Sequence, residues 1–184
     1  MTNIRKLTFG GLLVTMAILL PQGLHLIGGS AAGKLFLPMH LPVLLGGFLL
    51  GPIFGLAIGV LSPLLSFITT GMPDAARLPF MVFELAAYGF FSGFIHEKIK
   101  SEFGVKKRGV FISLISAMIF GRGVYAASLV IAAALFKVAG AGVIAMVNAT
   151  ITGIYGIILQ IAVIPPIIYI LERGGIVDKA FRKS

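Results

Sequence analysis

The stretch LPMHLPVLLGGFLLGPIFGLAIGVLSPLLSFITT, residues 37–70, contains no Asp, Glu, Lys or Arg. A helix needs about 20 consecutive apolar residues to cross the roughly 30 Å hydrocarbon core of a bilayer, so this stretch is too long for one span. Gly51-Pro52 predicts a tight turn inside it, because proline has no amide hydrogen and restricts the residue before it. We therefore expect two successive membrane helices, a short one at residues 37–50 and a longer one at residues 53–70.

The rest of the chain has the same character. Hydrophobic residues make up 58% of its 184 residues and charged residues only 11%, and the mean hydropathy of +1.07 lies outside the range of soluble domains. The apolar runs predict an all-α integral membrane protein with a single domain, residues 1–184, built from six transmembrane helices. We place these helices at residues 7–26, 37–50, 53–70, 79–95, 109–136 and 143–171.

Basic residues determine the expected orientation. The net charge of +9 comes mainly from three clusters, and six spans bring all three to one side of the membrane. By the positive-inside rule that side is cytoplasmic, and both termini lie there. The charge then needs no nucleic-acid partner and suits the anionic headgroups of a lipid bilayer. The clusters are Arg5 and Lys6; Lys98, Lys100, Lys106, Lys107 and Arg108; and Arg173, Lys179, Arg182 and Lys183.

Three loops are expected on the outer side, at residues 27–36, 71–78 and 137–142. Their charged residues are few, namely Lys34, Asp74, Arg77 and Lys137. The contrast with the basic side supports the orientation, because the rule depends on the excess of Lys and Arg in cytoplasmic loops.

Glycines and prolines predict how the helices pack. Four glycines stand four residues apart, the spacing that lets helix backbones approach closely in membranes; they are Gly47, Gly51, Gly55 and Gly59. Prolines inside two spans remove backbone hydrogen bonds and predict kinks; they are Pro63, Pro165 and Pro166.

One carboxylate, Glu84, interrupts the apolar run of residues 79–95. In hydrocarbon an ionised carboxylate costs at least a few kcal/mol unless it faces protein or water and finds a partner. With a rise of about 1.5 Å per residue, Glu84 lies about 8 Å below the outer end of its span and Arg122 about 10 Å below the outer face. His40 lies about 5 Å from the outer start of the helix expected at residues 37–50, and Asn148 about 8 Å from the outer start of the helix expected at residues 143–171. We therefore expect a polar layer, with one side chain from each of four helices, in the outer half of the membrane.

Two interpretations of this layer remain open. Glu84 and Arg122 form a buried ion pair that orders the helix bundle, or the layer lines a cavity that opens outward and binds a polar solute. Tyr88, one helical turn from Glu84, and Tyr125, three residues after Arg122, either stack on a flat ligand or pack in the interior. The outer loop above the layer either caps the solute or is a solvated connection; its residues are Met72, Asp74 and Arg77.

Motifs of enzymes and metal sites are absent from the sequence. The segment GGSAAGKL, residues 28–35, matches a phosphate-binding loop up to its lysine, but Leu35 stands where Ser or Thr belongs and no strand precedes it. The chain lacks HExxH and GxSxG, and with no cysteine it has no thiolate ligand or nucleophile. His96-Glu97 has no second histidine at metal-binding spacing. We expect no metal, no cofactor and no enzymatic activity.

Five segments, taken in order, resemble a known family: LPMHLPVLLGGFLLGP, FGLAIGVLSPLLSFITTGMP, FELAAYGFFSG, GRGVY and GIILQIAVIPPIIYILE. Together they resemble the substrate-binding S component of an energy-coupling factor (ECF) vitamin transporter, and within it the group of pantothenate, folate and cobalamin binders. The resemblance implies a six-helix protein of the prokaryotic plasma membrane that captures a vitamin or its precursor near the outer face with high affinity. The outer loops at residues 27–36 and 71–78 would cover this substrate.

The resemblance also implies partners. A transmembrane coupling subunit and two ATPase subunits would drive transport with ATP, and this chain has no ATPase motif of its own. In the family, small residues at AxxxA spacing on the first helix contact the coupling subunit. The corresponding positions are Gly11 and Thr15, which keep the small size but not the alanines.

The family does not determine the ligand, but charge favours an anionic vitamin. If Glu84 neutralises Arg122, an anion must use Arg77, His40 or Lys34; if the pair opens, Arg122 itself can clamp a carboxylate. We therefore expect pantothenate ahead of folate, cobalamin or a related compound.

Two rival functions remain. A self-sufficient secondary transporter of a small polar solute would protonate Glu84 in a proton-coupled cycle, and inverted repeats would favour it, but none is detected. An intramembrane enzyme would use His40 and Glu84 as acid and base, and it needs a nucleophile or a metal site at the same depth, which the sequence does not offer.

Overall fold

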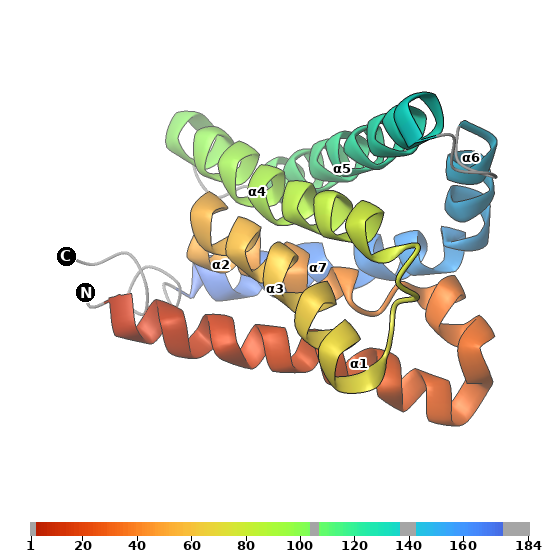
Figure 1. The fold of residues 1–184 in the computed structure, drawn as a ribbon. Helices are drawn as coiled ribbons and strands as arrows, with labels where there is room; N and C mark the ends of the chain where they lie inside the picture. Colours follow the sequence, from red (N-terminus) through yellow and green to blue (C-terminus); the bar gives the residue numbers. More distant parts are fainter. Residues whose placement is uncertain (1–2, 104–106, 137–142, 175–184) are drawn as a thin grey trace.

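The computed structural model describes residues 3–103, 107–136 and 143–174, and every regular element in these ranges is a helix. Figure 1 shows how the helices are arranged. In chain order they are α1 (Asn3–Phe36), α2 (His40–Leu50), α3 (Pro52–Thr70), α4 (Leu78–Phe103), α5 (Lys107–Phe136), α6 (Val143–Thr152) and α7 (Ile154–Arg173). The expected all-α fold is confirmed for these residues.

Five of these helices are long and apolar enough to cross a membrane. They are the candidate spans Ile4–Gly29, Pro52–Thr70, Leu78–Glu102, Arg108–Ala134 and Ile154–Arg173. The expected short second helix, α2, has 11 residues and therefore a length of about 16 Å, roughly half of the hydrocarbon core. The chain is thus a multi-pass membrane protein, while the count of six spans stays a prediction.

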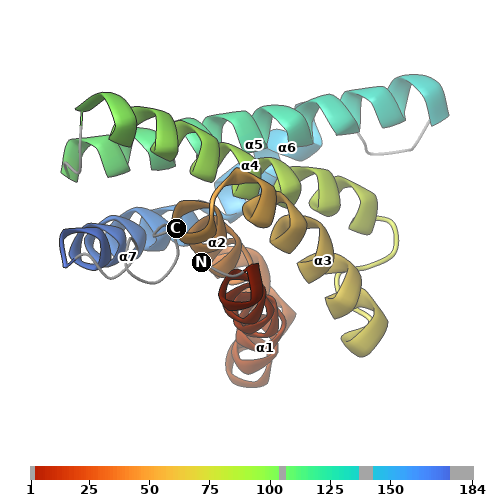
Figure 2. The same ribbon diagram turned by 90° about the vertical axis from the view of Figure 1, so that its left-hand side faces the viewer.

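The short helix α2 lies in the middle of the bundle rather than against lipid. Figure 2 shows it enclosed, with α4 and α5 on one side, α1 on the opposite side and α3 and α7 flanking it. Eight of its 11 residues are buried. Leu44 and Phe48 from α2 pack in one hydrophobic core with Leu85 of α4, Leu114 of α5 and Ile164 of α7. A helix surrounded by protein can be short, because its neighbours exclude lipid from its ends.

Residues 27–36, expected as an outer loop, are helical, because α1 continues to Phe36. The candidate span of this helix ends at Gly29, and the position of the segment outside the membrane stays a prediction. The interruption is confined to Gly29, whose φ of 63° and ψ of −168° are not helical. Glycine adopts a positive φ without steric cost, and the alanines that follow favour helix, so α1 changes direction and then resumes (Figure 1).

The single last helix expected at residues 143–171 is also wrong. It divides at Gly153 into α6 and α7, and Figure 1 shows α6 standing steeply to α7. Gly153 packs on Leu37, and a Cβ at this glycine would come within 2.7 Å of a Leu37 methyl carbon. The break therefore follows from the contact between Gly153 and Leu37, which lies just before α2. The apolar pattern of residues 143–171 contains no information about this contact.

Close packing at three of the four spaced glycines is confirmed. A Cβ at Gly47 or Gly55 would collide with the backbone carbonyl of Gly89 on α4, and one at Gly59 with the carbonyl of Leu85. Gly51 has a different role, since its φ of 94° makes the turn between α2 and α3. The α4 glycines that complete this contact, Gly89 and Gly93, are a part of the pattern that the sequence analysis does not identify.

The basic segments gather at one end of the molecule. Figure 1 shows the start of α1, the end of α4, the start of α5 and the end of α7 on the same side, which we call the basic end. Within the described ranges, this arrangement agrees with the prediction that the three clusters of basic residues lie on the same side of the membrane. Several basic residues and one loop of the prediction lie outside the described residues: Lys106, Lys179, Arg182, Lys183 and residues 137–142. The cytoplasmic position of this end stays a prediction.

Candidate functional site

Three of the four residues expected in the polar layer lie together, and Tyr88 joins them. Arg122 Nη1 of α5 lies 2.9 Å from Glu84 Oε1 of α4, and His40 Nε2 of α2 lies 3.7 Å from the same oxygen. The His40 ring contacts Tyr88 edge-on, with 5.2 Å between the ring centroids. We call these four residues, from three helices, the Glu84 cluster.

The Glu84 cluster is buried. Glu84 is 4% exposed, His40 2% and Tyr88 1%, while the Arg122 side chain is 13% exposed. Removing one partner of a buried ion pair typically costs about 3–5 kcal/mol of stability, because the other charge is left uncompensated. The cluster therefore needs both charges, and its geometry alone agrees with either of the two interpretations of the layer.

A glycine on α5 allows Arg122 to reach Glu84. Gly121 lies flat against the Tyr88 ring, and a Cβ at this position would approach the ring carbons to 2.8–2.9 Å. The missing side chain brings α5 close to α4, and Arg122 follows in the next position. On the other side of α4, Leu85 lies against Gly59 of α3. The depth of Glu84 and Arg122 follows from the sequence, but their contact depends on these two glycines.

His40 is positioned by the turn between α1 and α2. Leu37 has a φ of 47°, a left-handed conformation that is uncommon for a residue with a side chain, and its carbonyl accepts a 3.1 Å hydrogen bond from the His40 amide. Gly156 of α7 packs directly on the Phe36 carbonyl. The start of α7 thus holds the turn that delivers His40 to the cluster.

Several polar atoms of the cluster are buried without a hydrogen-bond partner in the described part of the chain. They are Nδ1 and Nε2 of His40, Oε1 of Glu84, and Nε and Nη2 of Arg122. The 2.9 Å contact between Glu84 and Arg122 is an ion pair whose N–H does not point well enough for a hydrogen bond to Oε1. A buried polar group left unpaired costs about 1–3 kcal/mol. These atoms are hydrogen-bonding capacity that the cluster's own contacts leave unused.

The other expected site residues lie around the cluster with more exposure. Tyr125 is half-buried on α5, three residues after Arg122. Met72 and Arg77 are exposed in the segment before α4. Asn148 is exposed on α6, because the break at Gly153 separates this helix from α7.

A buried glutamine on α7 was not among the predicted site residues. Gln160 is 1% exposed, and its Nε2 has no hydrogen-bond partner in the described ranges. It lies one helical turn after Gly156, the glycine that packs on the Phe36 carbonyl. The polar residue in the apolar run GIILQIAV was the available signal.

A second ionic cluster joins α4 to α7 at the basic end. Glu172 Oε2 lies 3.0 Å from His96 Nε2, and Glu172 Oε1 accepts a 2.9 Å hydrogen bond from Lys100 Nζ. His96 is 12 residues from Glu84 on the same helix, or about 18 Å away. No group of three potential metal ligands occurs among the described residues. The mutual pairing of these three side chains indicates that they fix the ends of two helices.

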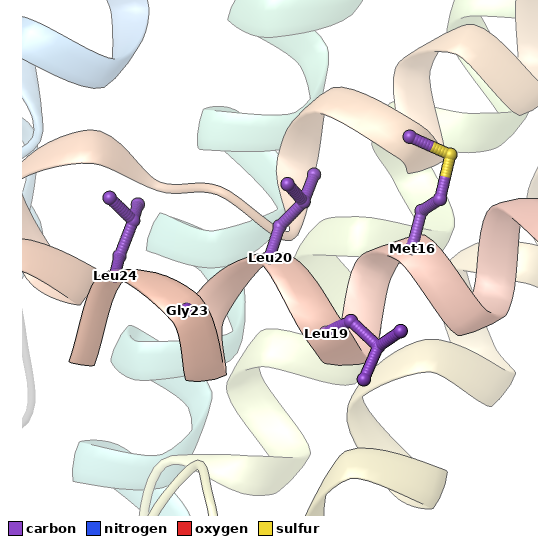
Figure 3. Close-up of a pocket in the computed structure, with 5 residues that line it drawn as sticks. All are labelled: Met16, Leu19, Leu20, Gly23 and Leu24. Atoms are coloured by element: carbon purple, nitrogen blue, oxygen red, sulfur yellow. The ribbon is translucent and has the colours of Figure 1, made fainter. Parts of the chain in front are cut away.

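The described part of α1 also carries an apolar hollow of about 300 Å³ on its exposed side. Figure 3 shows that its lining residues all come from this helix; they are Met16, Leu19, Leu20, Gly23 and Leu24. None of these side chains can donate a strong hydrogen bond, so the hollow cannot orient a polar solute. Gly11 and Thr15 precede these residues on the same helix, with Met16 directly after Thr15.

Comparison with known proteins identifies the family. The chain matches the family model described as ECF transporter, substrate-specific component, over residues 5–168. The comparisons with curated proteins and with solved structures found no match. The matched range covers every helix that contributes to the Glu84 cluster, and the family consists of transporter components rather than enzymes. The chain therefore belongs to the family of ECF transporter substrate-specific components, and it is a multi-pass membrane subunit that binds a small-molecule substrate for transport.

Proposed function

We propose that this protein captures a water-soluble vitamin or vitamin precursor with high affinity at the Glu84 cluster, on the outward-facing side of a prokaryotic plasma membrane. The supporting observation is the buried group of unpaired donors and acceptors on His40, Glu84 and Arg122. Ionisable residues inside a membrane domain mark substrate paths by default, because they are costly to keep there. Both termini and the basic end then face the cytoplasm.

Pantothenate is the proposed substrate, ahead of folate, cobalamin or a related compound. An anionic vitamin suits a layer that contains the Arg122 cation, whose side chain is only 13% exposed. Tyr88, Tyr125 and Asn148 complete the proposed contacts, and Met72 and Arg77 cover the layer from outside.

The test of this function is the identification of the bound compound. The protein is purified in mild detergent, denatured, and the released small molecules are analysed by mass spectrometry. We expect one vitamin or precursor at about one molecule per protein, absent from the Arg122→Ala variant prepared in parallel. An empty protein that still drives uptake into liposomes without any ATPase would contradict the proposal and favour a self-sufficient secondary transporter.

The proposed partners are a transmembrane coupling subunit and two ATPase subunits, with ATP hydrolysis on the latter. The face of α1 that carries Gly11 and Thr15 suits contact with the coupling subunit. Thr15 donates its hydroxyl to the Gly11 carbonyl at 2.9 Å, so this small surface presents no unpaired hydroxyl. Small residues on a membrane helix permit close approach of a second helix.

Replacing Gly11 with tryptophan is expected to spare vitamin binding and to reduce co-purification of the coupling subunit by at least about tenfold, since a bulky side chain blocks close helix contact. The measurement is a pull-down of the coupling and ATPase subunits with the tagged protein. Ile119→Trp, at an exposed apolar position of α5, is the matched control and should assemble normally. Unchanged assembly of Gly11→Trp and Thr15→Trp would show that this face is not the contact.

A further inference from the structure

Arg122 keeps two of its donors free while it pairs with Glu84. Nη1 lies 2.9 Å from Glu84 Oε1, whereas Nε and Nη2 are buried and have no hydrogen-bond partner among the described residues. These two nitrogens are neighbours on the planar guanidinium, and their N–H bonds point in parallel from its side edge. The ion pair and the free edge therefore coexist on one side chain.

We propose that this side edge of Arg122 binds a carboxylate of the substrate, and that the transported compound is an organic acid held by two parallel N–H···O bonds. The inference rests on the proposed function and specifies the chemical class of its substrate. A carboxylate matches the guanidinium edge in spacing and charge, and the paired bonds are short and about twice as strong as neutral hydrogen bonds. The Glu84–Arg122 pair does not have to open, because a different nitrogen makes that contact.

Charge balance favours a carboxylate over a phosphate group. Glu84 and Arg122 offset each other, so every negative charge of a bound anion adds to a pair that is already neutral. His40 has two unpaired ring nitrogens and lies 3.7 Å from Glu84, so its ring N–H can donate a hydrogen bond to such an anion. A carboxylate adds one negative charge to this buried site. A doubly charged phosphate adds up to two, which is more costly.

The test compares acids with their neutral counterparts. Wild-type protein in detergent is titrated calorimetrically with three pairs: pantothenate and pantothenol, biotin and biotin amide, and nicotinate and nicotinamide. If mass spectrometry identifies another bound acid, that acid and its amide form a fourth pair. We expect the bound acid to lose affinity by at least about tenfold when its carboxylate becomes an alcohol or amide, the ratio that one charge-assisted hydrogen bond supplies. This comparison needs no variant that must fold.

A conservative variant tests the side edge of Arg122 with its two parallel N–H bonds. Arg122→Lys keeps the positive charge near Glu84 but replaces the planar fork with a single ammonium, so we expect acid binding to weaken by at least about tenfold. Its neutral counterpart should lose much less. Arg108→Lys, the same change at an exposed position of the same helix, should bind like the wild type.

The outcomes separate this inference from the proposed function. A bound compound that lacks a carboxylate, or a neutral counterpart that binds as tightly as the acid, would overturn the carboxylate assignment while substrate capture stands. Normal acid binding by Arg122→Lys would overturn the two-bond arrangement. A protein that neither retains nor binds any small molecule would contradict the proposed function, and the inference with it.

Discussion

Replacing Arg122 with alanine is expected to weaken substrate binding by at least about tenfold while the protein still folds. The change removes the guanidinium that lies 2.9 Å from Glu84 and its two buried unpaired donors. A lost hydrogen bond to a charged group costs about 1.5–3 kcal/mol, and each 1.4 kcal/mol is about tenfold in affinity. Titration of the detergent-purified protein with the compound identified by mass spectrometry gives the affinity.

A double variant separates binding from stability in this prediction. Arg122→Ala alone leaves a buried carboxylate, so its thermal unfolding midpoint should fall. Adding Glu84→Gln removes that charge, and the midpoint should recover in part while binding stays weak. If Arg122→Ala binds the substrate normally, the pair of Glu84 and Arg122 serves only to order the helix bundle, and the site lies elsewhere.

Replacing Gly89 with leucine is expected to prevent correct packing of α4 on α3 and to give the largest loss of stability. A Cβ at Gly89 would overlap the backbone carbonyl of Gly55, and a Cβ at Gly55 would overlap that of Gly89. Overpacking a core usually costs about 1–3 kcal/mol when side chains can shift; here the obstacle is backbone, so we expect a cost at or above the top of that range. The measurements are the yield of monodisperse protein on size-exclusion chromatography and the thermal unfolding midpoint.

Gly23→Leu is the matched control for this substitution. Gly23 lies on the exposed side of α1, and a Cβ there meets no atom within 4 Å. Both changes gain helix propensity equally, so a difference between them reports packing. Equal stability of the two variants would mean that α3 and α4 do not make the backbone contact described here.

Much of the site could be predicted because burying charge in a membrane is costly. Glu84 and Arg122 stand out in apolar runs, and counting residues along two helices places them at the same depth, where the structure joins them. His40 and Tyr88 follow from the same reasoning and join the cluster. Counting residues places Asn148 at a similar depth, but its side chain is exposed. The count assumed one straight helix from residue 143 onward, whereas the chain divides at Gly153.

Counting residues along a helix gives the depth of a side chain in the membrane. It does not give the rotation of the helix about its axis or the contacts between distant segments. Gln160 and Glu172 are buried polar residues that the sequence analysis does not place in any site. Glu172 pairs with His96, 76 residues away in the chain, and no local pattern connects them. The same is true of Gly153, where the break between α6 and α7 depends on Leu37.

By itself, the amino-acid sequence determined that the chain is a helical membrane protein, where most of its long helices run, and which polar residues share a level, since apolar length and the cost of buried charge are properties of each segment alone. The tertiary structure decided which of those polar residues touch, where α1 bends and the last span divides, and which nitrogens of Arg122 remain free. These features depend on glycines that bring two particular backbones together, and the fit of two surfaces is a property of the pair, not of either segment.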